Sequence, residues 1–390
     1  MNMIELITEI INRFGPRPAG SEAEHKAQRF IKSVCEELTD DVQLIEFDEY
    51  LDARFGKLKY YVAFYLIAMA LYWVPGGAIF GLVLGLINAF FIIFDLMSYR
   101  DILTNFPGPK QTSSNVDATL EPQGPVKSTI LIAGHMDSTR EYTWWYKLGE
   151  LGVKLTIVAG VLLVLQPLFY LWHVLSPETF HNYIWVGFLL LSPILIVYWS
   201  MHAEHAVDGA QDNLSGIAIS FAVFKGLKDP NQKGRSILQN TRIRFVSFGS
   251  EEKGLCGSRA YAQSKKQQLK NENAYLVNID SVRLVNEVAI VHRELMNGTK
   301  HTPALVNGLK ASFDKLQYPC NMATLPIGGT DAVSFARAGL PSVTIVGISA
   351  KKYDFTYHTR NDIVEHIEPK SLENVRNAVT DFIKTWDQTH

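Results

Sequence analysis

The sequence predicts an α/β fold that is interrupted twice by long apolar segments. Over most of the 390 residues, short runs rich in Val, Ile and aromatic residues alternate with stretches of helical periodicity. Apolar residues make up 47% of the chain and charged residues 19%. The apolar excess is concentrated in two blocks, Tyr60 to Met97 and Leu155 to Met201. Outside these blocks the composition is that of a soluble enzyme with a full hydrophobic core.

The remaining segments supply the strands and helices of the predicted α/β domain. The strand candidates are STILIAGH, TRIRFVSFGS, AYLVNIDSV, EVAIVH and PSVTIVGI. The helix candidates are Glu22 to Thr39, Gly216 to Leu227 and Pro369 to Trp386. Several candidate strands end in acidic or His residues. Because open α/β sheets place their sites at the carboxyl ends of strands, we expect a functional site there.

The first apolar block predicts a hairpin of two helices. From Tyr60 to Phe94 there is no Lys, Arg, Asp, Glu or His, and Pro75-Gly76-Gly77 breaks the run in its middle. At about 1.5 Å per residue, Ala78 to Met97 is long enough to cross a bilayer core of about 30 Å. The arm before the break is shorter, and it crosses only if Lys57 and Lys59 reach out to the membrane surface.

The second block predicts another hairpin, with arms Leu155 to Leu175 and Tyr183 to Met201. Pro167 and Pro193 are expected to kink these arms without preventing them. Since a hairpin returns the chain to the side that it left, segments 1–56, 100–150 and 202–390 can form one domain. The two predicted transmembrane hairpins are then 57–99 and 151–201.

A buried core or a dimerisation lid is the alternative interpretation of the two hairpins. The positions of Tyr and Trp favour the membrane, because their amphipathic rings prefer the headgroup level. At the bases of the hairpins lie Tyr60, Tyr61, Tyr99, Trp144, Trp145, Tyr146, Tyr198 and Trp199. Near the tips lie Tyr72, Trp73, Trp172, Tyr183 and Trp185. We therefore expect an integral membrane protein with four transmembrane helices.

Charge, cysteine content and the amino-terminal stretch narrow the function and the location. A net charge of -2 leaves no broad cationic surface for nucleic acid. Three cysteines give no disulfide framework, and MNMIELITEIINRFG lacks the pattern of a cleaved signal peptide. The hairpin bases carry Lys and Arg whereas the tips carry none, and this positive-inside bias predicts a cytoplasmic catalytic domain. The basic residues are Arg54, Lys57, Lys59, Arg100, Arg140, Lys147 and Lys154.

Two segments around the second hairpin carry candidate chemical groups. ILIAGHMDS contains His135 and Asp137, and GAQDNLSG contains Asp212 just before a predicted helix. A single His is more often structural than a metal ligand, but an Asp two residues away can orient its imidazole. Asp212 taken alone could be only a helix N-cap.

Three further segments add two adjacent Glu residues, an Asp and a His. Glu251 and Glu252 follow a strand, and a metal would explain their adjacency if one is a ligand and the other a proton acceptor. A solvated loop pair is the alternative. Asp280 ends an apolar run, where an unpaired buried acid is costly. His358 lies in a polar loop, whereas His366 leads into a helix and is expected to be structural.

Two His residues and several carboxylates suit zinc, which accepts both kinds of ligand. One bridging carboxylate could serve two ions about 3.5–4 Å apart. Five ligands then divide as two plus two plus a bridge. Each ion keeps an open position for water, as in catalytic rather than structural sites.

The ordered motifs resemble the two-zinc aminopeptidase family that includes bacterial leucine aminopeptidases and, more distantly, the glutaminyl cyclases. The similarity covers FGPRPAGSEAE, NVDATL, GHMDS, GAQDNLSG, SEEKGLCGSRAY, NIDSV, GGTDAVSFARAGLPSV and YHTRND, in family order. It extends over nearly all of the chain outside the hairpins. The resemblance implies a three-layer α/β/α sandwich with a central mixed sheet, and here it carries two added transmembrane hairpins.

The resemblance also implies roles for single residues. His135 and Asp280 would hold one zinc ion, Glu252 and His358 the other, and Asp212 would bridge them. The peptide bond after the bridging Asp is typically cis in this family. Glu251 would be the general base, and Asp137 would orient His135. Asp331 would help to shape the pocket.

Three departures from the family pattern bear on substrate preference. Gln211 stands where an acidic residue is frequent, Ala332 replaces a frequent His, and the hairpins are additional. The resemblance implies hydrolysis of the bond next to a free amino terminus, in peptides or aminoacyl compounds. The alternatives are cyclisation of amino-terminal glutamine and an inactive membrane scaffold. Because the chain segments between the second hairpin and the site are short, the site should lie near the membrane surface. The hairpins then either favour hydrophobic or membrane-associated peptides and amphipathic aminoacyl compounds, or merely tether a general aminopeptidase.

Overall fold

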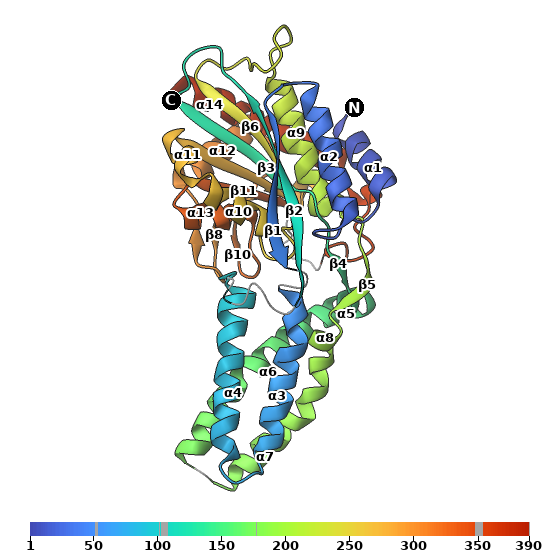
Figure 1. Cartoon of the computed structure of the whole chain (residues 1–390), viewed down its shortest axis with the longest axis vertical. Helices are drawn as coiled ribbons and strands as arrows, with labels where there is room; N and C mark the ends of the chain where they lie inside the picture. The colour runs from blue at the N-terminus through green and yellow to red at the C-terminus, as the bar shows by residue number, and fades with distance from the viewer. Residues whose placement is uncertain (51–53, 101, 103–107, 177, 348–353, 390) are drawn as a thin grey trace. The chain divides into compact units, whose positions relative to one another are not determined.

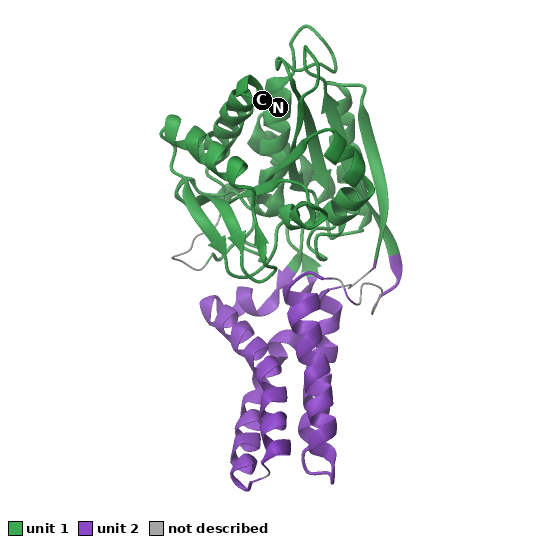
Figure 2. Ribbon diagram, turned by 90° about the vertical axis from the view of Figure 1, so that its left-hand side faces the viewer, with its two compact units in different colours: residues 1–49, 111–140, 205–390 green, residues 50–110, 141–204 purple. Residues whose placement is uncertain are grey.

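A computed structural model describes residues 1–390 except 51–53, 101, 103–107, 177, 348–353 and 390 (Figure 1). The chain divides into two compact units (Figure 2). Unit 1 comprises Met1–Glu49, Gln111–Arg140 and His205–His390, and unit 2 comprises Tyr50–Lys110 and Glu141–Glu204. The predicted hairpins, 57–99 and 151–201, lie inside the two segments of unit 2. The second segment of unit 2 begins within β4 (Arg140–Tyr142) and ends within β5 (His202–Ala206), and these strands pair as a two-stranded sheet.

Unit 1 is built on a mixed sheet with the strand order β1-β2-β6-β3-β7-β11-β8-β10, in which β9 pairs with β8. Strands β6, β3, β7 and β11 are parallel, whereas β2 and β8 join them antiparallel. The strands are β1 (Val42–Tyr50), β2 (Lys110–Leu120), β3 (Ser128–His135), β6 (Thr241–Phe248), β7 (Ala274–Asp280), β8 (Val288–Glu294), β9 (Thr299–Lys300), β10 (Asn321–Leu325) and β11 (Ser342–Gly347). All five predicted strand runs fall on strands of this sheet, although Ile348 lies outside the described residues.

Helices cover both faces of the sheet, because alternate strand residues point to opposite sides. In β3, Ile130 and Ile132 pack with the cluster that includes helices α1, α2, α9, α12 and α14, whereas Leu131 and Ala133 pack with α10, α11 and α13. Unit 1 is therefore a three-layer α/β/α sandwich. Its helices are α1 (Met3–Phe14), α2 (Glu22–Glu36), α9 (Gly216–Leu227), α10 (Cys256–Ser264), α11 (Lys266–Asn271), α12 (Pro303–Lys315), α13 (Asp331–Ala338) and α14 (Pro369–Thr389).

Unit 2 is formed by apolar helices that pack on one another. Small residues of α4 allow a close approach to α6: a Cβ on Gly81 would lie 2.5 Å from the ring of Tyr170, and one on Gly85 3.1 Å from Pro167. Helix α6 continues through Pro167, whereas a 3-10 turn containing Pro193 separates α7 from α8. The helices are α3 (Leu58–Leu71), α4 (Gly77–Phe91) continuing as a π-helix (Ile92–Met97), α5 (Thr143–Leu148), α6 (Glu150–Leu175), α7 (Phe180–Leu191) and α8 (Ile196–Trp199).

Among the described residues, three helical segments are long and apolar enough to cross a membrane. They are Gly77–Met97, Glu150–Leu175 and Phe180–Trp199. The fourth predicted span corresponds to α3, which has 14 residues. A bilayer core needs about 20 helical residues, so α3 alone falls short of this length.

Candidate metal centre

The candidate ligands and the candidate base meet at one edge of the sheet. His135 ends β3 and Asp280 ends β7, two neighbouring parallel strands. Glu251 and Glu252 follow β6, which pairs with β3 on its other side. Asp212 lies in the turn that leads into α9, and His358 lies in the segment after β11. The structure thus brings together all the residues for which the sequence predicted metal binding or base chemistry.

Two buried groups of three side chains each place their ligand atoms within 4.8 Å of one another in the described part of the chain. The first is His135, Asp212 and Asp280, and the second is Asp212, Glu252 and His358. Asp212 belongs to both. Its Oδ1 lies 3.2 Å from Nε2 of His135, and its Oδ2 lies 3.1 Å from Nε2 of His358. One carboxylate therefore presents one oxygen to each group, which is the arrangement that a bridging ligand requires.

Asp137 contacts both His135 and the backbone of Glu251 and Glu252. Its carboxylate oxygens accept hydrogen bonds from the backbone N–H of Glu251 at 2.9 Å and of Glu252 at 3.0 Å. Nδ1 of His135 lies 3.1 Å from the backbone oxygen of Asp137 and 3.4 Å from its Oδ1. Asp137 thus contacts His135, which it is predicted to orient, and it also fixes the backbone of both Glu residues.

The electrostatics of the centre favour a bound cation. Burial raises the pKa of Glu252 well above its usual range, and the neighbouring Asp212 raises it further. Burial also raises the pKa of Asp280 to about 6. Oε1 of Glu252 is buried and accepts no hydrogen bond from any described residue. Several buried acids in one place are costly unless a cation compensates them, so the donor set fits zinc.

Glu251 differs from the ligands in position and in surroundings. Its Oε2 lies 3.9 Å from Nε2 of His135, and the side chain keeps 12% of its exposure. Burial raises the pKa of Glu251 well above the ordinary Glu value, with Glu252 and Asp331 adding to the shift and His135 opposing it. Glu251 is thus a carboxylate that lies beside the candidate ligands and belongs to neither ligand group.

The turn around Asp212 is held by a residue to which sequence reasoning gave no role. The carboxylate of Asp362 accepts from the backbone N–H of Gln211 at 2.6 Å and of Asp212 at 3.1 Å. The peptide bond between Asp212 and Asn213 is cis, as the resemblance implies. Asp362 lies inside the YHTRND motif, which is the only sequence signal for it, because its contacts are all to backbone atoms.

Three further residues that the sequence analysis named belong to neither ligand group. Gln211 accepts a hydrogen bond at 2.6 Å from the hydroxyl of Thr356, two residues before His358. Asp331 is fully buried at the start of α13, and its electrostatic influence reaches Glu251. Nδ1 of His366 lies 2.7 Å from the backbone oxygen of Asn361, and His366 belongs to neither ligand group, as predicted.

Comparison with known sequences relates this chain to peptidases. Residues 194–383 match the model of peptidase family M28. Aminopeptidase YwaD of Bacillus subtilis is 27% identical over 193 residues, which are 47% of this chain and 40% of that protein. Leucine aminopeptidase 1 of Metarhizium robertsii is 27% identical over 177 residues, which are 42% of each protein. The chain thus matches less than half the length of these curated relatives.

Solved structures show the same fold over nearly the whole chain. A zinc aminopeptidase from Bacillus subtilis superposes with a TM-score of 0.57 at 16% identity, covering 99% of this chain and 94% of the other. The glutaminyl cyclase of Porphyromonas gingivalis gives a TM-score of 0.58 at 13% identity, covering 99% and 97%. These structures share the fold of this chain, and within that fold the described residues form the two candidate ligand groups. The similarity to peptidase family M28 covers residues 194–383, just under half of the chain.

Proposed function

We propose that this chain is a membrane-anchored aminopeptidase that uses two zinc ions to remove amino-terminal residues from peptides. The observation that carries the proposal is Asp212, which offers one oxygen to each of two buried ligand groups. His135 and Asp280 complete one group, and Glu252 and His358 complete the other. The aminopeptidase names of the sequence relatives support the same chemistry.

Each residue of the centre has a separate task in this mechanism. Bound zinc supplies a Lewis acid for the scissile carbonyl and lowers the pKa of a coordinated water. Glu251 takes a proton from the attacking water and delivers it to the leaving amine. Asp137 keeps Glu251 and Glu252 in place through their backbone N–H groups. Burial raises the pKa of Glu251, and this makes its carboxylate a stronger proton acceptor than an exposed Glu.

A panel of aminoacyl chromogenic substrates tests this proposal on the detergent-solubilised chain. We expect release of the chromophore, its loss after treatment with a chelator, and its return when zinc is added. No turnover of any substrate by a chain that holds two zinc ions would contradict the proposed reaction.

Two other functions remain as alternatives, each with its own readout. Glutaminyl cyclisation is kept because a cyclase shares the fold. The Asp-Asn-x-Ser-Gly segment at Asp212 favours hydrolysis. A substrate with amino-terminal glutamine separates the two reactions, because cyclisation yields pyroglutamate and ammonia whereas hydrolysis yields free glutamine. An inactive membrane scaffold would lack bound zinc, so a zinc assay tests it.

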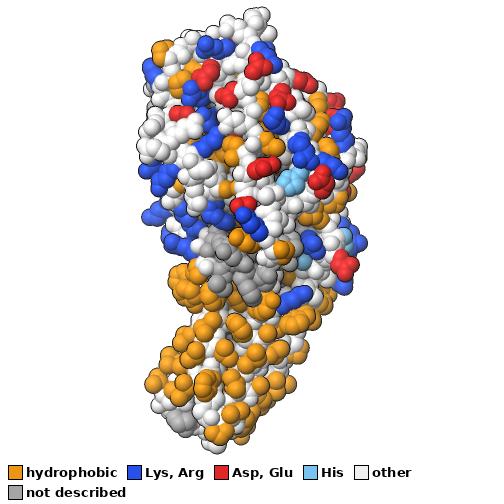
Figure 3. Space-filling view, viewed as in Figure 1, with side chains coloured by type: hydrophobic (Ala, Val, Ile, Leu, Met, Phe, Trp, Pro, Cys, Tyr) orange, Lys and Arg blue, Asp and Glu red, His pale blue; other side chains and the backbone are white. Residues whose placement is uncertain are grey.

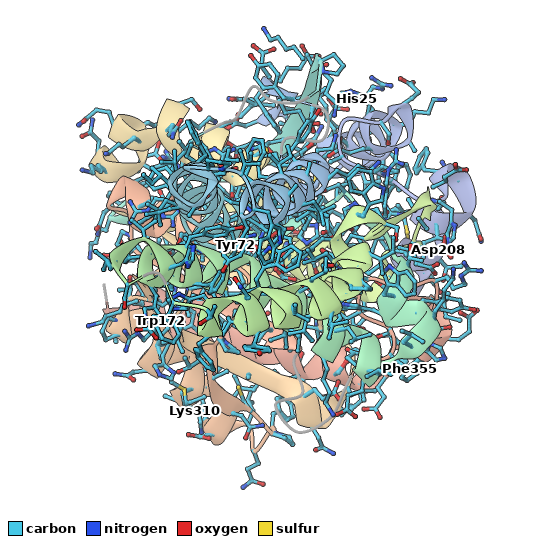
Figure 4. The ribbon with its side chains drawn as sticks, turned by 90° about the horizontal axis from the view of Figure 1, so that it is seen from below. His25, Tyr72, Trp172, Asp208, Lys310 and Phe355 are labelled. Atoms are coloured by element: carbon cyan, nitrogen blue, oxygen red, sulfur yellow. The ribbon has the colours of Figure 1, made fainter. Side chains whose placement is uncertain are left out.

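The membrane part of the proposal rests on the surface of unit 2. Apolar side chains cover unit 2, whereas charged side chains gather on unit 1 (Figure 3). Leu175 is 75% exposed, Leu190 73% and Phe80 65%. So large an apolar surface is rare on a soluble monomer and is typical of contact with lipid. Tyr72 and Trp172, labelled in Figure 4, belong to the aromatic residues expected at one membrane interface.

The proposed side of the membrane follows from the basic residues at the hairpin bases. Their distribution predicts that the catalytic unit faces the cytoplasm. A reporter fused after His390 tests this orientation in cells. Activity of a reporter that functions only outside the cytoplasm would reverse the assignment.

A further inference from the structure

Arg17, in the amino-terminal GPRPAG motif, is a fully buried arginine whose donors are directed at backbone oxygens. Nε donates to the oxygen of Met136 at 2.9 Å, and Nη1 to that of Gly15 at 2.7 Å. Nη2 donates to the oxygen of Asp208 at 2.8 Å. Burial lowers the pKa of Arg17 to about 10, so the guanidinium remains charged at neutral pH. The side chain is thus a rigid, charged fork between segments that are distant in the sequence.

The backbone oxygens that Arg17 contacts flank the long segment between the two predicted ligands. Met136 follows the ligand His135 directly, and Asp208 lies four residues before the bridging Asp212. Between them the chain leaves unit 1 after Arg140, forms the second segment of unit 2, and returns at His205. Arg17 therefore contacts the chain on both sides of this excursion.

Ser138 connects the same two parts of the chain, through its backbone and through its hydroxyl group. Arg17 donates its backbone N–H to the hydroxyl of Ser138 at 3.0 Å and accepts from the backbone N–H of Ser138 at 2.9 Å. The same hydroxyl donates to the oxygen of Val207 at 2.8 Å. Gly209 has a positive φ, and a Cβ there would lie 2.6 Å from Cβ of Ser138. The two ends of the excursion thus meet at a site where there is no room for an extra carbon.

We propose that Arg17 is a positioning residue of the metal centre, which fixes His135 relative to Asp212 by holding the backbone oxygens of Met136 and Asp208. The inference rests on the proposed two-metal site. It explains why a motif without any candidate ligand belongs to the ordered series that carries the family resemblance. The sheet holds His135 and Asp362 holds the turn at Asp212, and Arg17 adds a direct link that sets the spacing between these two parts of the chain. That spacing determines whether one carboxylate can serve both ligand groups.

The test is Arg17→Lys in the full-length, detergent-solubilised chain, with Co²⁺ replacing zinc as a spectroscopic probe. Lysine keeps the charge but cannot donate in three fixed directions. We expect metal affinity to fall roughly 10–100-fold, as for other residues that orient ligands, and the Co²⁺ absorption spectrum to change. The matched control is Arg29→Lys on α2, where the arginine side chain is half-exposed and contacts only Glu22 among the ion pairs of the described residues. The control should bind Co²⁺ like the unmodified chain.

A folded Arg17→Lys chain with unchanged Co²⁺ affinity and spectrum would overturn the proposal, even if its melting temperature were lower. If Arg17→Lys does not fold, Ser138→Ala takes its place, because it removes only the hydroxyl that joins Arg17 to Val207. We expect Ser138→Ala to change the spectrum in the same direction by a smaller amount, and an unchanged spectrum would again overturn the inference. An unmodified chain that binds no Co²⁺ or zinc would instead refute the proposed function.

Discussion

Units 1 and 2 differ in the side chains that they bury and in those that they expose. Unit 1 encloses a group of acids at the ends of its central strands, among them Asp137, Asp212, Glu252 and Asp280. Unit 2 exposes many large apolar residues, and a buried ion pair there joins Lys57 to Asp95. The buried acids of unit 1 and the exposed apolar groups of unit 2 therefore have different energetic requirements. The acids of unit 1 require hydrogen bonds or a cation, and the proposed membrane anchoring would cover the apolar surface of unit 2.

The largest expected effect separates metal binding from base catalysis inside unit 1. Glu251→Gln should lower kcat by about 10²–10⁴-fold, because it removes the proton acceptor. Zinc content should stay near two ions per chain, since Glu251 belongs to neither ligand group. The contrasting variant Asp212→Ala should lose metal as well as activity. Kinetics and metal analysis on the same samples check both, and a Glu251→Gln chain that keeps most of its activity would exclude the proposed base.

The sequence predicted the positions of those candidate ligands that lie at the end of a strand. His135 and Asp280 follow apolar strand runs, and the parallel pairing of β3 with β7 brings such ends together. His358 lies in a loop, so the sequence marked it by its residue type and polar neighbours, and only the family resemblance gave it a partner ligand. Arg17 and Asp362 were not predicted as supports, because both act through backbone atoms and backbone contacts leave no periodic pattern in a sequence.

The boundaries of the apolar helices were predicted less well than their existence. Helix α6 begins at Glu150, five residues before the apolar run, because the charged first turn can extend a helix without adding hydrophobicity. Helix α7 ends at Leu191, where a 3-10 turn with Pro193 interrupts it. The short α3 shows that the absence of charge does not fix helix length, since the chain turns before Pro75.

A second prediction addresses packing inside unit 2. Gly81→Ala should destabilise unit 2 by about 1–3 kcal/mol, because the new methyl group would lie 2.5 Å from the buried ring of Tyr170. Gly187→Ala, at a helix position where a Cβ meets nothing within 4 Å, is the matched control. Thermal unfolding in detergent measures both variants. Equal melting temperatures for the two would show that α4 and α6 do not pack in this way.

A third prediction concerns the pH dependence of unit 1 without metal. Burial, with Asp212 nearby, raises the pKa of Asp362 to about 8, and burial raises that of Asp280 to about 6. The unfolded chain releases these protons near pH 3.9, so between pH 4 and pH 8 the native state binds more protons than the unfolded state. The free energy of unfolding must then fall as the pH rises through this window. Zinc should reduce this fall, because a cation favours the ionised acids.

Amide hydrogen exchange in β3 and β7 at several pH values measures this slope on metal-depleted protein. Asp362→Asn should make the slope shallower, because it removes one of the groups that retain a proton. Asp40→Asn changes an exposed carboxylate and serves as the control. Stability that rises with pH across the window would contradict the assignment of these acids.

The smallest expected effect is that of an apolar tail on the substrate. Only twelve residues separate Asp137 from the start of α6 at Glu150, and each residue extends the chain by at most about 3.3–3.6 Å. If α6 crosses a bilayer, this tether limits how far the metal centre can lie from the headgroups. A substrate that partitions into the membrane would then reach the centre at a raised local concentration. We expect an apolar tail on a peptide to increase kcat/KM several-fold.

The comparison requires one peptide with and without an apolar tail, and the full-length chain in nanodiscs. Detergent micelles of the same chain are the control, because they remove the extended membrane surface while keeping the enzyme. The tail should act mainly on KM, since it changes the local concentration of substrate and not the reacting groups around Glu251. Equal kcat/KM values in nanodiscs would leave the hairpins as a tether alone. A gain of the same size in nanodiscs and in micelles would instead indicate an apolar pocket in unit 1. Comparing the two media therefore distinguishes a preference that comes from the membrane surface from one that comes from the catalytic unit.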